Sequence, residues 1–109
     1  MTYDIIWEFR VPQPSLDAFE AAYGPDGTWA RLFARAPGFV EVELLRCAEV
    51  EGRYLTIDRW VSRRLFETFQ EEFADDYREL DKTLEDLIMI ETRLGAFENV
   101  RASELASDT

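Results

Sequence analysis

The sequence contains no histidine, and this absence excludes several classes of enzyme. Ser-His-Asp triads, Cys-His dyads, His-ligated haem and nearly all zinc enzymes need an imidazole group. Proton transfer near neutral pH would therefore have to use Asp, Glu, Tyr, a water tuned by Arg, or the substrate itself.

Cysteine, lysine and long apolar runs are also scarce. Cys47 is the only cysteine, so no disulfide can form within the chain, which fits a reducing cytoplasm. Lys82 is the only lysine. No segment approaches the roughly 20 apolar residues that span a bilayer, and the first residues lack the pattern of a signal peptide. We therefore expect a cytoplasmic protein.

The charge balance is strongly acidic. The 23 Asp and Glu residues outnumber the 12 Lys and Arg residues, which gives a formal net charge of -11. Nucleic-acid binding needs clustered Lys and Arg, and an anionic membrane surface attracts the same residues. We expect neither of these partners.

The 109 residues suffice for one compact domain with a real core, since 47% are hydrophobic and 14% aromatic. Alternation and turn residues predict strands at 3–11, 39–50, 53–61 and from 88 onward. Helical spacing predicts two short helical pieces separated by "GPDG" at 24–27, and a long helical region from Ser62. The order β-α-β-β-α-β predicts an α+β, ferredoxin-like antiparallel sheet with helices on one face. We assign residues 1–98 to this domain and 99–109 to a polar tail.

The long helical region carries one continuous apolar stripe, which "ADD" at 74–76 could bend or split. Its members follow steps of three and four: Phe66, Phe69, Phe73, Tyr77, Leu80, Leu84 and Leu87. The hairpin before it has two open registers, one placing Glu43 opposite Arg59 and the other placing it opposite Asp58.

The strand at 53–61 has no clean polar face. One face carries Tyr54, Thr56, Asp58 and Trp60, and the other carries Leu55, Ile57, Arg59 and Val61. A sheet with one solvated face would alternate apolar and polar residues. We therefore expect both faces to be covered, one by helices and the other by a second copy of the chain, as a homodimeric α+β barrel.

Several stretches together are similar to the antibiotic biosynthesis monooxygenase-like family of the dimeric α+β barrel superfamily. They are "YDIIWEFRV", "FEAAYGPDGTWARLFARAPGF", "LLRC", "YLTIDRWVSRRLFETF" and "YRELDKTLEDLIMIETRLGAF", and they cover about residues 3 to 97. The most specific part is Trp60 followed by Ser62 and Phe66, with "APGF" before the second strand. The resemblance implies a homodimer with a pocket between sheet and helices.

Members of this family differ in their chemistry. Some oxidise polycyclic aromatics with O2 and no metal or flavin, some degrade haem, and others act in quorum-signal processing. The haem-degrading members need a helix Trp where this chain has Phe69, and an iron-binding His that it lacks. Their strand Asn has no counterpart either, since Asn99 is the only asparagine. The resemblance thus implies no metal and no cofactor.

Two sets of residues are candidates for a site. Aromatic residues could stack a planar ligand, or could simply form the core: Trp29, Phe33, Trp60, Phe69, Phe73 and Tyr77. Asp58 and Arg46 could orient a phenolic ligand and assist its deprotonation, as catalytic residues, or could be an ion pair across the hairpin or the dimer interface. Arg10, Glu91 and Arg93 have the same two interpretations. Tyr23 could form a mouth over the pocket.

The leading hypothesis is a monooxygenase-like protein that binds an aromatic or polyketide-like small molecule and oxidises it without a cofactor. The alternative is a non-catalytic small-molecule-binding or interaction protein on the same dimeric scaffold. A third class is an isomerase or lyase that acts on a lactone. Fold membership alone does not choose between them.

Overall fold

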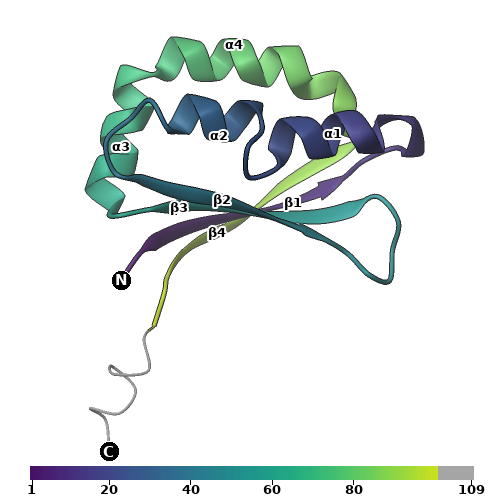
Figure 1. Cartoon of the computed structure of the whole chain (residues 1–109), viewed down its shortest axis with the longest axis horizontal. Coiled ribbons are helices and arrows are strands. Elements are labelled where there is room, and N and C mark those ends of the chain that lie inside the picture. Colours follow the sequence, from purple (N-terminus) through teal and green to yellow (C-terminus); the bar gives the residue numbers. More distant parts are fainter. Residues whose placement is uncertain (101–109) are drawn as a thin grey trace, which may run out of the picture.

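The computed structural model describes residues 1–100 and shows one antiparallel sheet with every helix on the same side (Figure 1). The strands are β1 (Tyr3–Arg10), β2 (Phe39–Arg46), β3 (Arg53–Trp60) and β4 (Ile90–Glu98), in the spatial order β2-β3-β1-β4. This confirms the predicted α+β, ferredoxin-like fold. Most of the predicted polar tail, residues 101–109, lies outside the described residues.

The helices cover one face of the sheet in two chain segments. The first holds η1 (Gln13–Ser15), α1 (Leu16–Tyr23) and α2 (Thr28–Phe33), and the second holds α3 (Arg63–Glu72), α4 (Ala74–Leu84) and η2 (Glu85–Leu87). The "GPDG" stretch separates α1 from α2, as expected. The long helical region breaks at Phe73, whose φ of -113° and ψ of 22° leave the helical range. The split therefore falls one residue before "ADD".

Ser62 begins α3 as the sequence indicates. Its side-chain oxygen accepts a hydrogen bond from the Leu65 backbone N–H at 3.2 Å, which satisfies one of the free donors at the helix start.

We expect Ser62→Ala to lower the free energy of unfolding by about 1 kcal/mol, the usual cost of losing such a cap. Urea denaturation monitored by circular dichroism measures this change. Ser62→Asp is the matched control, because its carboxylate can accept the same hydrogen bond. Equal losses in both variants would show that the cap is not the cause.

The core between sheet and helices is built mainly from aromatic rings. Trp60 is 0% exposed and packs edge-on against Phe33 and Phe39, with ring centroids 5.7 and 5.5 Å apart. Phe69 of α3 is 1% exposed and lies 5.0 Å from the Trp60 ring. The predicted helix stripe thus meets the side of β3 that carries Trp60, which places Asp58 on the helix-covered face.

The hairpin register differs from both predicted alternatives, because Glu43 lies opposite Ile57. Strand β2 ends at Arg46 and does not continue to Val50, so the connection is longer than the predicted turn. Gly52 closes it with a φ of +82°, where an added Cβ would lie 2.4 Å from the Val11 carbonyl oxygen. The Arg59 side chain still reaches Glu43 diagonally, at 3.1 Å.

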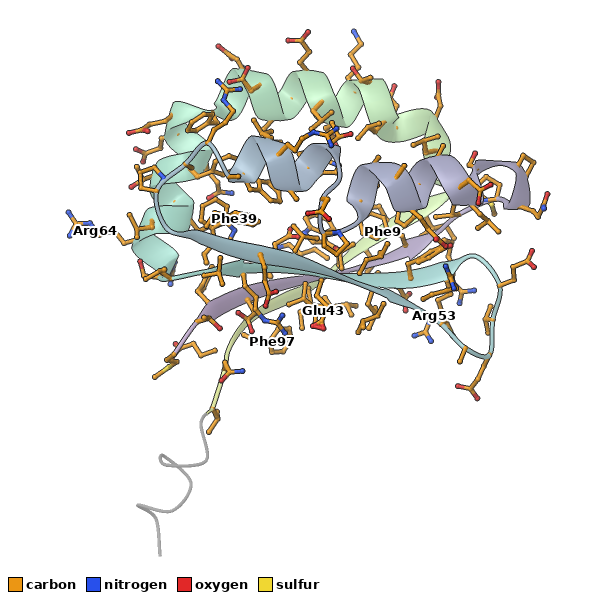
Figure 2. All side chains as sticks on the ribbon, viewed as in Figure 1. Phe9, Phe39, Glu43, Arg53, Arg64 and Phe97 are labelled. Atoms are coloured by element: carbon orange, nitrogen blue, oxygen red, sulfur yellow. The ribbon has the colours of Figure 1, made fainter. Side chains whose placement is uncertain are left out.

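The sheet face opposite the helices, called the open face, mixes apolar and charged side chains. Its apolar members include Ile6, Leu45, Leu55, Ile57, Ile90 and Phe97. The labelled Phe97 and Glu43 lie on this side (Figure 2).

Arg59 organises the charges of the open face through contacts with Glu41, Glu43 and Asp4 at 3.0, 3.1 and 3.5 Å. Charges therefore pair across the sheet around Arg59, whereas Asp58, the acidic member of the ion pair considered from the sequence, takes no part. Separately, none of the helices in residues 1–100 combines the length and apolarity needed to cross a membrane.

Candidate functional site

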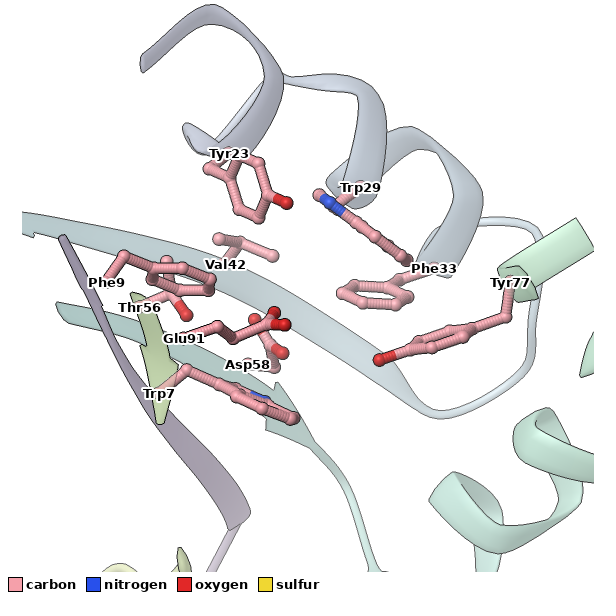
Figure 3. A pocket seen from close by; sticks show the side chains of 10 residues that line it. All are labelled: Trp7, Phe9, Tyr23, Trp29, Phe33, Val42, Thr56, Asp58, Tyr77 and Glu91. Atoms are coloured by element: carbon pink, nitrogen blue, oxygen red, sulfur yellow. The ribbon is translucent and has the colours of Figure 1, made fainter. Parts of the chain in front are cut away.

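Two adjoining cavities lie between the sheet and the helices. The inner recess has a volume of about 30 Å³ and is lined by Trp7, Phe9, Tyr23, Trp29, Phe33, Val42, Thr56, Asp58, Tyr77 and Glu91 (Figure 3). The outer cavity has a volume of about 410 Å³ and is lined by Ile5, Trp7, Asp58, Phe66, Gln70, Ala74, Tyr77, Arg78 and Arg93. Both cavities border Trp7, Asp58 and Tyr77, so these three residues form the wall between them.

Asp58 occupies the centre of this wall because of its place in β3. Its neighbours across the ladder are Ile5 of β1 and Val42 of β2, so no cross-strand cation faces it. Within residues 1–100, its carboxylate forms no ion pair. Burial alone raises the pKa of Asp58 from 3.8 to about 7, because the charged form loses hydration and gains no partner. This carboxyl can therefore accept or release a proton near neutral pH.

Hydrogen-bond donors from three helices surround the inner recess. Tyr23 comes from α1, Trp29 from α2 and Tyr77 from α4, and all three side chains point toward it (Figure 3). Trp29 is 6% exposed, and its buried indole nitrogen lies near the Tyr23 hydroxyl group without a hydrogen bond of normal geometry. Burial, with smaller effects of nearby carboxylates, raises the pKa of Tyr77 to about 12, and burial also raises the pKa of Tyr23. Both phenols thus stay protonated at neutral pH.

Glu91 supplies a second carboxyl group to the inner recess. It lies opposite Phe9 in the ladder, so its side chain shares the helix-covered face with Trp7 and Phe9. The residue as a whole is exposed on the edge strand β4, but its carboxyl end points into the recess (Figure 3). Burial, and then the nearby Asp81 carboxylate, raise the pKa of Glu91.

The outer cavity combines apolar walls with a polar rim. Ile5, Trp7 and Phe66 supply apolar surface, and Arg78 and Arg93 supply positive charge in an otherwise acidic protein. Its volume lies in the range of small-molecule sites, and its aromatic walls suit a planar ligand.

The predicted aromatic set divides into two groups. Trp29, Phe33 and Tyr77 border the inner recess, and Tyr77 also borders the outer cavity. Trp60, Phe69 and Phe73 border neither cavity and belong to the packed interior or its edge. Phe73 stacks on Phe69 with ring centroids 5.3 Å apart and lies under the Arg35 guanidinium.

The structure does not bring Arg46 to Asp58. Arg46 ends β2, and its exposed guanidinium forms two hydrogen bonds with Glu20 of α1, at 2.7 and 3.0 Å. Glu20 also accepts a hydrogen bond from the Tyr54 hydroxyl at 2.5 Å. Arg46 and then Tyr54 lower the pKa of Glu20. Arg46 thus holds α1 to the sheet and borders neither cavity.

Sequence reasoning missed the contribution of β1 to the site, and it left Glu91 and Arg93 of β4 open between a ligand site and an ion pair. Trp7 and Phe9 share one face of β1 at a period of two, but only the pairing of β1 with β3 brings that face beside Asp58. Glu91 and Arg93 also reach the cavities through strand pairing. Within residues 1–100, no three His, Cys, Asp or Glu side chains are grouped so as to hold a metal ion.

Comparison with known proteins places the chain among relatives of the same fold. The family described as antibiotic biosynthesis monooxygenase matches residues 3–79. A variant of SnoaB, a cofactor-independent oxygenase from Streptomyces nogalater, is 23% identical with a TM-score of 0.74, covering 93% of this chain and 95% of its own.

Two further solved structures are similar over most of their length. A candidate antibiotic biosynthesis monooxygenase from Bordetella bronchiseptica is 25% identical with a TM-score of 0.70, covering 92% of this chain and 98% of its own. One from Nitrosomonas europaea is 17% identical with a TM-score of 0.69, covering 93% and 92%. Comparison with curated proteins gives no significant match.

Proposed function

This chain belongs to the antibiotic biosynthesis monooxygenase family, and on that premise we propose that it oxidises an aromatic or polyketide-like phenol with O2 and no bound cofactor. The phenol occupies the outer cavity, with its hydroxyl group toward Asp58. The observation that carries this proposal is the Asp58 carboxyl, which borders both cavities without an ion-pair partner in residues 1–100. The fold similarity to a cofactor-independent oxygenase supports it.

The reaction starts with removal of a proton. The Asp58 carboxylate accepts the phenolic proton, and the resulting electron-rich anion supplies electrons to O2. For a ring methylene next to the phenol, two C–H bonds break and one C=O bond forms, while the second oxygen atom leaves as water. The substrate provides all the electrons. Because the Asp58 pKa is raised to about 7, the turnover rate should rise as the pH increases through that value.

Aromatic stacking holds the ligand in place. Trp7 presents its ring to both cavities, and Phe66 lines the outer one. Tyr77 remains a hydrogen-bond donor at neutral pH and can bind the developing phenolate oxygen. Arg78 and Arg93 at the rim favour a ligand that becomes anionic.

The open face supports a homodimer as the working unit. Leu45 and Phe97 on this face are 42% and 49% exposed, and the Arg59 ion-pair group lies beside them. An apolar surface with ordered charges resembles the interfaces of stable homo-oligomers. A second copy packed sheet to sheet would cover it.

We expect Trp7→Ala to weaken binding of 1,8-dihydroxyanthrone, an oxidisable phenol, by about tenfold or more. Stacking of a planar ring on an aromatic side chain contributes about 1–3 kcal/mol, and alanine cannot stack. Fluorescence titration measures the affinity, and an oxygen electrode measures oxidation above the uncatalysed rate. Phe73→Ala is the matched control, because this ring borders neither cavity.

Two results would count against the proposal. Wild-type affinity in Trp7→Ala would mean that the ligand does not occupy the outer cavity. Tight binding by the wild-type protein without oxygen uptake would favour the alternative of a non-catalytic binding protein.

A further inference from the structure

Asp58 and Glu91 both border the inner recess, which gives a proton on Asp58 a way out that does not cross the outer cavity. Asp58 borders both cavities, whereas Glu91 borders only the inner recess. Glu91 also lies on the exposed edge strand β4. With a ligand in the outer cavity, the route that remains from Asp58 to solvent runs through the inner recess and past Glu91, whose carboxyl group points into the recess (Figure 3).

The inner recess fits one water molecule. Its volume of about 30 Å³ exceeds the roughly 10–15 Å³ that one water needs. Trp29 is 6% exposed and borders the recess, and its indole N–H lies near the Tyr23 hydroxyl group without a well-formed hydrogen bond, whereas buried donors are normally satisfied. The Thr56 hydroxyl and the carboxyl groups of Asp58 and Glu91 offer further partners. A water there would satisfy Trp29 and join the two carboxyl groups.

We propose that Glu91 is the outer end of a proton relay that runs from Asp58 through one water in the inner recess. This inference rests on the proposed function, because the relay serves the proton that Asp58 takes from the phenol. The phenolic O–H bond breaks as the Asp58 O–H bond forms. Asp58 then gives this proton to the water, which passes one of its own protons to the Glu91 carboxylate. Glu91 then releases a proton to solvent. The net result is the transfer of one proton from the phenol to solvent, with no transfer of electrons.

The charged and titratable groups around the relay are consistent with this direction. Tyr23 of α1 and Tyr77 of α4 stay neutral at pH 7, so they donate hydrogen bonds but do not trap the proton. Burial, and then the Asp81 carboxylate of α4, raise the pKa of Glu91, which helps it hold a proton in transit.

Arg93 follows Glu91 on the same face of β4 and borders the outer cavity with Arg78. Both arginines favour the ionised phenol. Since Glu91 does not reach the outer cavity, it is a positioning and relay residue, not a catalytic one.

The first test needs no substrate. Infrared spectroscopy in D2O follows the carbonyl band of protonated Asp58, assigned by its loss in Asp58→Asn. In Glu91→Gln the midpoint of this band should fall, because the recess water that accepts a hydrogen bond from protonated Asp58 would no longer donate one to a carboxylate, which favours the protonated form less. Glu98→Gln is the matched control on the same strand, and its midpoint should stay at the wild-type value. An unchanged midpoint in Glu91→Gln would overturn the relay.

The second test measures oxidation of 1,8-dihydroxyanthrone. In dilute buffer, Glu91→Gln should lower kcat by about tenfold with KM unchanged, and added formate should restore the rate by carrying the proton. A loss that formate does not restore would overturn the relay. If the wild-type protein does not oxidise this probe, the proposed function fails for it, while the infrared result still decides whether the carboxyl groups are linked.

Discussion

Asp58→Asn should abolish phenol oxidation and, at pH 8, make the protein more stable. The folded state raises the Asp58 pKa from 3.8 to about 7. Between these values the native protein holds a proton that the unfolded chain has released, so wild-type stability falls as the pH rises. The rise in pKa corresponds to at most about 4 kcal/mol, and contact with the cavities reduces this through solvent screening. Asparagine carries no charge, so the variant does not bear the cost of burying an ionised carboxylate at pH 8.

Urea denaturation at pH 4, 6 and 8 checks this expectation. Asp58→Asn should match the wild-type protein at pH 4 and exceed its free energy of unfolding by about 2–3 kcal/mol at pH 8. Asp86→Asn, which changes an exposed carboxylate, is the control and should show no such gap. A variant less stable than the wild type at pH 8 would mean that the Asp58 carboxylate has a stabilising partner.

Ile57→Arg should convert the proposed homodimer to a monomer. Ile57 lies in the central part of the open face, opposite Ile6 of β1 and Glu43 of β2. Glu43 is already paired with Arg59, so in a sheet-to-sheet dimer the new guanidinium would be buried without a carboxylate of its own, which costs several kcal/mol. We expect the dissociation constant to rise by about a thousandfold or more. Light scattering at micromolar concentration should then give a mass near 12.7 kDa for the variant and twice that for the wild-type protein.

Thr83→Arg is the control for this experiment. It introduces the same charge on an exposed position of α4, on the helix side of the sheet, and should leave the dimer intact. A wild-type mass of 12.7 kDa would contradict the dimer itself. A dimeric Ile57→Arg variant would place the interface elsewhere.

The fold was predictable because its signals are local. Alternation in the strands, the helix stripe from Phe66 to Leu87 and the breaks at "GPDG" each follow from a few neighbouring residues, and together they specify the element order. The hairpin register was not predictable, because it depends on the length of the connection after Arg46. The face that holds Asp58 likewise needed the packing of α3 against Trp60.

The candidate site was predictable only in part. Asp58 stands out as a charge among large apolar groups, and the structure places it between two cavities. The sequence alone cannot separate aromatic residues that border a cavity from those in the core, since Tyr77 and Phe69 follow the same helical period. Nor does it show that Arg46 pairs with Glu20, because this contact joins residues far apart in the chain.

The irregular pairing of β1 with β4 has a consequence for how the protein can change in evolution. Ile6 pairs with Gly95 but Trp7 pairs with Arg93, so Leu94 is an extra residue in β4. Before Leu94 the odd-numbered residues face the helices, and after it the even-numbered ones do. Leu94 is therefore a β-bulge that changes which residues of the strand face the helices. If Leu94 were deleted, the residues on one side of it would turn to the opposite face of the sheet. A single inserted residue therefore lets Glu91 and Arg93 face the cavities while Phe97 faces the open face.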